Sequence, residues 1–343
     1  MARLHHDHTQ HHTGCCLSSQ EPTIKTGLSD YSPKDKHWNR HRSHVDAISD
    51  IYAKAEEFEK LSDRMGECSG WLGFRWVIDK TTGETQLKLR LANFCRVRYC
   101  PVCQWRRSLM WQARFLTALP SIVEQFPKSR WLFLTLTVRN CEISDLSETL
   151  SQMNKAWNKF IKRKDLKPIQ GWIRTTEVTR GEDRSAHPHF HVLMMAPPSW
   201  FTGKYYVKHS RWIELWRESL QANYDPNVDI RVVKPKKGSN KTLTPATSAE
   251  LLQGAVAETL KYSTKADDLL VDEQWFLELT KQTHKKRFLA TGGALKDILK
   301  MDQETNEDLI HGDDTEEVNP DEEGELVRFH WDQPRKEYHK KQN

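Results

Sequence analysis

The segment HPHFHVLMMA, residues 187–196, decides the fold because its polar and apolar residues alternate with the period of a β-strand. In a strand, His187, His189 and His191 share one face. The opposite face is apolar and is expected to pack into the core; it carries Phe190, Val192, Met194 and Ala196. A single histidine is usually structural, but three imidazoles above an apolar back predict a metal site on the surface of a sheet.

The preceding segment, WIRTTEVTR (172–180), is also strand-like, and the short link GEDRSA (181–186) makes the two a predicted β-hairpin. Glu177 shares a polar face with two threonines of this strand. We therefore expect it to supply the oxygen ligand that a hard metal requires. A surface or salt-bridged glutamate is the alternative. The threonines of FLTLT (133–137) could line the same face or serve only as strand residues.

The segments around this hairpin alternate irregularly between strands and helices. Further strands are expected over 70–79, 85–94, 131–138 and 228–233. Helices are expected over 45–65, 104–119, 144–162, 210–222, 248–265 and 273–300. This mixture favours an α+β fold over a doubly wound parallel sheet.

Four cysteines form a second candidate metal site. Cys95, Cys100 and Cys103 fall within nine residues, and Cys100-Pro-Val-Cys103 is a C-x2-C turn that lets two thiolates reach one ion. Cys68 lies 27 residues before Cys95, across a predicted hairpin that would return it to the same place. We expect a structural zinc site, with reduced structural thiols as the alternative. The remaining cysteines are expected to be incidental thiols: Cys15, Cys16 and Cys141.

The segment ETLKYSTK (258–265) offers a carboxylate, a phenol and an amine at helical spacing. Glu258, Tyr262 and Lys265 lie at i, i+4 and i+7 and would form one stripe on a helix. Tyrosine has an unperturbed pKa near 10, so it needs a neighbouring cation or base to act as a nucleophile. Taken alone, the trio fits an ordinary solvated helix face. Together with the histidine strand, it becomes a candidate catalytic group.

Charge is distributed unevenly along the 343 residues. The chain carries a net charge of +5, to which residues 301–326 contribute −12 and residues 327–343 contribute +3, leaving +14 on residues 1–300. A basic body favours polyanionic partners such as nucleic acid. The sequence has no long apolar stretch and no secretory signal at its start, so we expect no membrane span and a cytoplasmic location.

Together these motifs resemble the rolling-circle plasmid replication initiators of the HUH (His-hydrophobic-His) endonuclease superfamily, in the single-tyrosine group with an N-terminal cysteine motif. The matching motifs are C-x4-C-P-x-C (95–103), FLTLT (133–137), HPHFH (187–191) and E-x2-KY-x2-K (258–265). The histidines precede the tyrosine, as in replication initiators and unlike conjugative relaxases. The resemblance covers about residues 68–300. It implies an RRM-like antiparallel sheet with helices on one side, plus a small four-cysteine zinc element.

The resemblance also implies two kinds of metal. His189 and His191, with Glu177 and His187 as further candidate ligands, would hold a catalytic Mg²⁺ or Mn²⁺. Zn²⁺ would bind the four cysteines and have a structural role.

The implied activity is the nicking of one strand at a plasmid origin. Tyr262 would attack the scissile phosphate, leaving a 5′-phosphotyrosine and a 3′-hydroxyl primer. Glu258 would activate water at termination, and Lys265 would neutralise phosphate charge. The implied partners are origin DNA, in single-stranded, hairpin and duplex form, and a host DNA polymerase. A host helicase is also implied, because the chain has no Walker-type phosphate loop.

Other functions fit parts of the pattern. A single-tyrosine transposase or relaxase would share the catalytic core, and a non-catalytic zinc-containing DNA-binding regulator would explain the cysteines and the basic body. A hydrolytic metalloenzyme of another class would explain the histidines. The expected organisation is a disordered His-rich tail over 1–46, a zinc- and DNA-binding region over 47–120, a nickase domain over 121–300, and an acidic then basic tail over 301–343.

Overall fold

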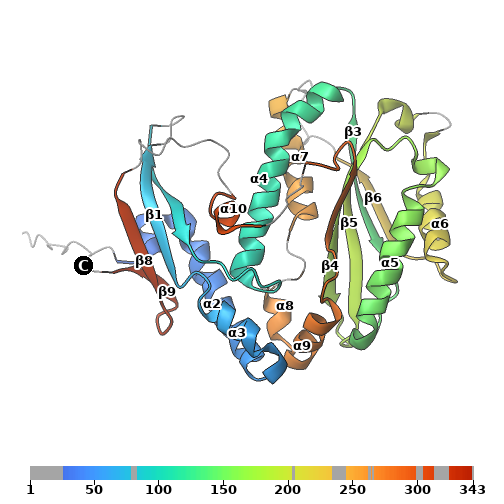
Figure 1. Cartoon of the computed structure of the whole chain (residues 1–343). Helices are drawn as coiled ribbons and strands as arrows, with labels where there is room; N and C mark the ends of the chain where they lie inside the picture. The colour runs from blue at the N-terminus through green and yellow to red at the C-terminus, as the bar shows by residue number, and fades with distance from the viewer. Residues whose placement is uncertain are drawn as a thin grey trace, which may run out of the picture.

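Two antiparallel sheets lie on either side of a long helix, and shorter helices pack around them (Figure 1). The computed structural model describes residues 26–78, 83–202, 205–233, 245–261, 264, 266–298, 304–312 and 324–341. The predicted α+β class with antiparallel pairing is confirmed. Within the described part of the chain, no helix combines the length and the apolar character that crossing a membrane requires.

The five-stranded sheet has the order β6-β3-β5-β4-β7. Its strands are β3 (Arg130–Thr137), β4 (Gly171–Arg180), β5 (Ala186–Ala196), β6 (Val228–Val232) and β7 (Leu289–Gly293). The predicted histidine strand is β5, at the centre of this sheet, and its hairpin with β4 is confirmed. A central strand is held by ladders on both sides, so the side chains of β5 have fixed directions.

The two faces of β5 meet different helices. Phe190, Val192 and Met194 are fully buried, as predicted. They lie in one core with α5 (Leu146–Phe160) and α6 (His209–Leu220). Leu193 and Met195 face the other way. There they pack with α7 (Pro245–Thr259) and the second half of α4 (Pro101–Gln125). Helices α5 and α6 are those expected on one side of the sheet. Helices α7 and α4 additionally cover part of the other face, which carries the histidines of β5 (Figure 1).

The second sheet has the order β2-β1-β8-β9. Its strands are β1 (Trp71–Ile78), β2 (Thr85–Ala92), β8 (Leu326–Asp332) and β9 (Glu337–Lys340). The interpretation of residues 301–343 as a tail is therefore wrong for 326–340. Val327, Phe329 and Tyr338 are buried in this sheet, but the neighbouring run of acidic residues hides their alternation in the sequence. A short helix, α10 (Asn306–Ile310), precedes β8.

The predicted disordered N-terminal tail is also wrong over residues 28–46. Helices α1 (Leu28–Tyr31), α2 (His37–Ala53) and α3 (Glu59–Gly66) occupy this end of the chain. Trp38 is 1% exposed, with its ring 4.8 Å from that of Trp105. Because most of the other α2 residues before Val45 are polar, its helical period is weak in the sequence and the helix depends on tertiary packing. The histidines at 5–12, Cys15 and Cys16 lie outside the described residues.

Two predicted helices are shorter than expected. The helix predicted over 273–300 ends early: α9 spans Glu273–Gln282, and β7 follows. Lys285, three residues after the helix ends, has a φ of +56°, which an α-helix does not accommodate, and residues 289–293 pair with β4 instead. The helix predicted over 248–265 stops at Thr259, and a short helix, α8 (Ala266–Leu270), follows.

Candidate active site

Glu177, His189 and His191 converge on the face of the sheet that carries α7. Glu177 of β4 is directly opposite His189 of β5 in the antiparallel register, so their side chains meet across the strands. Its Oε2 lies 3.1 Å from His189 Nε2 and 2.7 Å from His191 Nε2. The ligand atoms of the three residues lie within 4.8 Å of one another, close enough to share one ion. Thr135 Oγ1 is 3.4 Å from His191 Nδ1 and helps to orient that ring.

Glu177 is 4% exposed and yet ionised. Burial would raise its pKa, but hydrogen bonds from His189, His191 and Lys261 outweigh burial and hold the pKa well below its usual range. A carboxylate that stays charged beside two imidazoles is a suitable ligand set for a divalent cation.

Lys261 belongs to the site, although no role was expected for it from the sequence. Its Nζ lies 2.9 Å from Glu177 Oε2 and 2.8 Å from Glu258 Oε1. Burial opposes its charge, but these two carboxylates raise the pKa of Lys261 above its usual value. The sequence does contain a sign of this pairing. Lys261 comes three residues after Glu258, and side chains three residues apart are neighbours on the surface of a helix.

The segment that follows α7 is fastened to the sheet and to α4 by three hydroxyl groups. Thr175 Oγ1 donates to the Thr259 carbonyl at 2.5 Å, and Ser108 Oγ donates to the Leu260 carbonyl at 2.7 Å. Thr264 Oγ1 donates to the Val178 carbonyl at 3.3 Å, next to Glu177. The bonds to the Thr259 and Leu260 carbonyls satisfy groups that a continuing helix would use, which is consistent with the end of α7 at Thr259.

The predicted stripe of Glu258, Tyr262 and Lys265 stays a prediction, since α7 ends at Thr259 and only Glu258 of the three lies within it. Glu258 lies in the last turn of α7 and is 49% exposed at its side chain. Tyr262 and Lys265 lie outside the described residues. His187 stands apart from the metal-competent group; its ring centre is 5.4 Å from that of His189.

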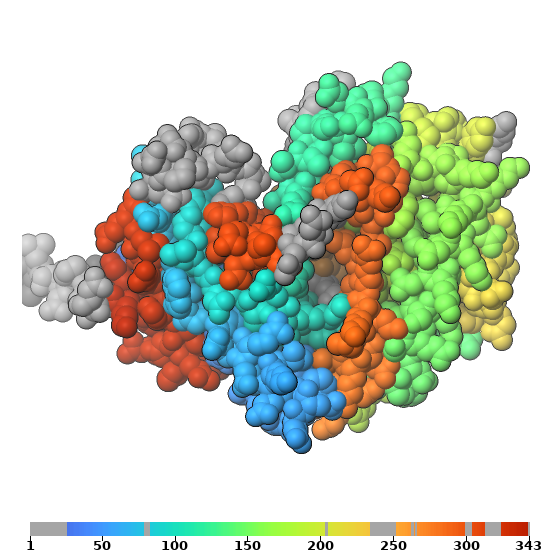
Figure 2. Space-filling model, viewed as in Figure 1, coloured from blue at the N-terminus to red at the C-terminus, as the bar shows by residue number. Residues whose placement is uncertain are grey.

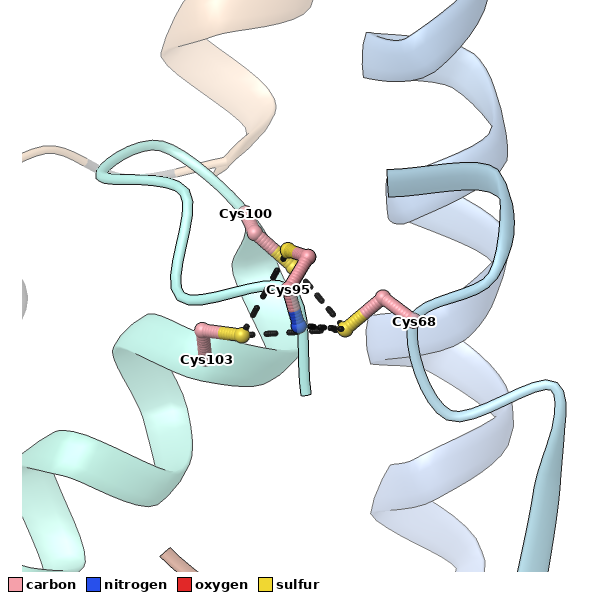
Figure 3. Close-up of side chains that lie close together, drawn as sticks. All are labelled: Cys68, Cys95, Cys100 and Cys103. Atoms are coloured by element: carbon pink, nitrogen blue, oxygen red, sulfur yellow. Dashed lines mark hydrogen bonds between the residues drawn. The ribbon is translucent and has the colours of Figure 1, made fainter. Parts of the chain in front are cut away.

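The four predicted zinc ligands come together at the start of α4 (Figure 3). Cys68 Sγ lies 3.6 Å from the sulfurs of Cys100 and Cys103, and Cys95 Sγ lies 3.6 Å from that of Cys103. Four sulfurs at 2.3 Å from a tetrahedral zinc ion lie about 3.8 Å apart, so the quartet fits zinc. All four residues are buried, with exposures of 0–8%.

Backbone groups around the quartet favour thiolates. The Arg96 amide donates to Cys103 Sγ at 3.3 Å, and the Val97 amide donates to Cys95 Sγ at 3.4 Å. Contacts from the other three cysteines lower the pKa of Cys95, whereas burial raises the pKa of Cys100 and of Cys103. A cation is therefore needed to keep all four sulfurs deprotonated together.

A family model described as "Replication protein" (Rep_1) matches residues 86–339, which include Glu177, His189 and His191 and every cysteine of the quartet except Cys68. The chain belongs to the Rep_1 family of rolling-circle plasmid replication proteins. It is 34% identical over 296 residues to a "Protein rep" of Streptococcus pneumoniae serotype 2, covering 83% of this chain and 87% of the relative. It is 34% identical over 300 residues to a "Protein rep" of Lactiplantibacillus plantarum, covering 84% and 90%. A "Replication protein" of Staphylococcus aureus is 35% identical over 229 residues, covering 63% and 93%.

No solved structure gives a significant match to this replication protein. Membership in the family implies that it binds origin DNA.

Three arginines of α4 form ion pairs or hydrogen bonds with residues 304–310. Arg107 makes a bidentate ion pair with Glu304 at 2.6 and 2.8 Å, and Arg114 pairs with Asp308 at 2.6 Å. Arg106 is buried and donates to the carbonyls of Leu309 and Ile310, so α10 is tied to α4.

Proposed function

We propose that this replication protein initiates rolling-circle replication by nicking one strand of its plasmid origin through a covalent tyrosine intermediate. The observation that carries the proposal is the Glu177, His189 and His191 cluster together with its contact to Lys261. Lys261 precedes Tyr262 in the chain and contacts Glu177 directly. Tyr262 is therefore covalently linked to a residue whose side chain reaches the cluster.

In the proposed reaction, the Tyr262 hydroxyl oxygen attacks the phosphorus of one phosphodiester. The tyrosine oxygen–phosphorus bond forms while the bond from phosphorus to the 3′ oxygen breaks. Tyrosine loses its proton, and the leaving oxygen gains one. The products are a 5′-phosphotyrosine and a 3′-hydroxyl that primes a host DNA polymerase.

The mixed oxygen and nitrogen donors of Glu177, His189 and His191 fit a divalent ion such as Mg²⁺ or Mn²⁺. Such an ion, when bound, would supply positive charge at the scissile phosphate. The protein contributes rigid placement. The β4–β5 register fixes Glu177, and Thr135 contacts the His191 ring.

In the proposal, Glu258 is the group that ends a replication cycle. Its carboxylate is half exposed, and Lys261 holds it near the cluster. It would accept the proton of the water that breaks the phosphotyrosine bond at the regenerated origin. Lys265 would neutralise phosphate charge during both steps.

The rest of the chain has supporting roles in this proposal. Zn²⁺ at the four cysteines would stabilise the region over 47–120, which would bind origin DNA beside the nickase domain over 121–300. A host helicase would unwind the duplex, and the protein would work in the cytoplasm. Membership in a replication family supports this assignment over a transposase or a relaxase.

The test is covalent capture of origin DNA with Mg²⁺ or Mn²⁺ present. We expect wild-type protein to form a 5′ adduct and Tyr262→Phe to form none. Tyr206→Phe is the matched control, since Tyr206 is 56% exposed and lies outside the cluster. A persistent adduct in Tyr262→Phe would reject the nucleophile, and no cleavage by wild type would favour the non-catalytic regulator.

Glu258→Gln tests the termination step separately. We expect this variant to nick at close to the wild-type rate but to accumulate the adduct, because water is no longer activated. Unchanged release of the adduct would remove Glu258 from the mechanism.

A further inference from the structure

A cationic cavity adjoins the proposed active site. It has a volume of about 120 Å³ and is lined by residues that include Arg98, Arg107, Ser108, Trp111, Lys261 and Phe288. Figure 2 shows this face of the molecule hollowed between the teal atoms of the α4 region and the orange atoms of residues 266–298. Two residues that line the cavity adjoin the proposed nucleophile in the chain. Ser108 Oγ donates to the Leu260 carbonyl, and Lys261 directly precedes Tyr262.

Arg98 is the cation in this cavity whose charge is left without an acidic partner. Arg107 pairs with Glu304, and Lys261 pairs with Glu177 and Glu258. Arg98 instead donates to the Lys286 carbonyl at 2.7 Å and stacks 4.5 Å over the Phe288 ring. Among the described residues, no carboxylate contacts it. Burial, and then the nearby Arg107 charge, lower the pKa of Arg98 from its usual value.

An unbalanced arginine in a half-buried cavity is a recognition group for an anion. A partly desolvated cation costs free energy unless an anion compensates it, and a guanidinium matches the oxygens of a phosphate. The volume is well below the roughly 300–1,000 Å³ of pockets that enclose drug-sized ligands. The cavity therefore suits a phosphate group and is too small for a whole nucleotide.

We propose that this cavity binds a phosphate of the DNA strand that neighbours the phosphate attacked by Tyr262, with Arg98 as the principal cation. The inference rests on the proposed nicking function. Lys261 lines the cavity and contacts Glu177, so a phosphate held here lies on the same strand path as the scissile one. Such a contact would set the register of the strand before the cut.

The test removes one phosphate charge at a time. A labelled single strand spanning the origin nick is prepared with a neutral methylphosphonate at each position in turn. Each strand is bound to the full-length, zinc-loaded Tyr262→Phe protein, which cannot cut it. We expect one position other than the scissile phosphate at which neutralisation weakens binding about tenfold, as for a lost charge-assisted hydrogen bond.

Arg98→Gln should abolish that position effect, because it removes the charge and keeps an N–H donor for the Lys286 carbonyl. Arg98→Lys should retain most of it, and Arg328→Met on β8 is the matched control at a distance. Thermal melting of each variant shows that it is folded. A scan in which no such position exists, or one that Arg98→Gln leaves unchanged, would overturn the proposal.

Inorganic phosphate provides the second arm, because a free anion has the same chemistry. Thermal stability is measured with added phosphate against chloride at equal ionic strength. Stabilisation by phosphate combined with a flat methylphosphonate scan would assign the cavity to a free anion and reject the DNA contact. Covalent capture by wild type on the same strand separates the two proposals: an adduct with a flat scan rejects only the cavity, whereas no adduct rejects the nicking function.

Discussion

The two clusters able to hold a metal differ in ligand chemistry and in their openness. The cysteine quartet has four sulfurs, all buried, at the start of α4 and behind a four-stranded sheet. The second cluster has one carboxylate and two imidazoles on the face of the five-stranded sheet, beside a cavity that Lys261 lines. Four protein ligands close the coordination of zinc, whereas three leave room for a substrate or water. The difference supports the proposal that the quartet is a structural site and the second cluster a catalytic one.

The largest effect is expected from breaking the closed site. Cys100→Ser should release the metal and unfold the four-stranded sheet with the start of α4. Structural zinc contributes roughly 10–16 kcal/mol of apparent binding free energy in small domains, so losing one ligand removes a large part of the stability. Zinc content and thermal melting measure the change.

Cys141→Ser is the matched control, because Cys141 is a free thiol outside the quartet. It should keep full zinc content and melt close to the wild-type temperature. Equal zinc loss in both variants would show that the quartet is not the zinc site.

Breaking the open site should abolish activity and spare the fold. His191→Ala removes a ligand and is expected to lower the nicking rate about a thousandfold with little change in melting temperature. His187→Ala should lower the rate less than about threefold, because His187 stands apart from the group. Single-turnover cleavage with Mn²⁺ measures both rates. Equal losses would place His187 among the ligands and correct the comparison.

Low pH is expected to destabilise the region around the cysteines through His41. The His41 ring stacks on the Trp105 ring, with their centres 4.6 Å apart. Burial, together with His44, His37 and Arg40, lowers the pKa of His41 to about 4. The unfolded chain binds this proton near pH 6.5, so the free energy of unfolding falls as pH drops from 7 toward 4. The loss at pH 5 is about 2 kcal/mol. Urea unfolding of wild type and His41→Phe measures it.

His41→Phe keeps an aromatic ring against Trp105 and should remove that part of the pH dependence. If wild type and variant lose stability in parallel between pH 7 and 5, the acid response belongs to other groups.

The smallest effect is expected from Thr135→Val, which deletes the hydroxyl near His191 Nδ1. At 3.4 Å this contact is long, so we expect at most a tenfold loss of Mn²⁺ affinity, at the lower end for such supporting bonds. Calorimetric titration with Mn²⁺ measures it. A loss as large as that of His191→Ala would mean that Thr135 does more than orient the ring.

The sequence predicts best where a strict period carries the chemistry. The alternation around His189 and the C-x2-C turn at Cys100 were enough to place both clusters. Prediction fails where tertiary contacts decide. Trp38 secures α2 against Trp105, and hydroxyl groups on β4 and α4 donate to carbonyls where α7 ends at Thr259. Lys261 was missed because its partner Glu177 lies 84 residues away in the chain.

The position of β8 beside β1, with β9 on its outer side, affects the order in which the protein is completed. The Tyr338 hydroxyl donates to the Ser69 carbonyl at 2.6 Å, next to Cys68, and β8 begins about 250 residues after β1 ends. At about 5–20 residues per second, a ribosome needs roughly 12–50 seconds to cover that distance. All strands of the five-stranded sheet are synthesised in that interval. The sheet beside the cysteine quartet is thus completed last, after translation has passed the five-stranded sheet.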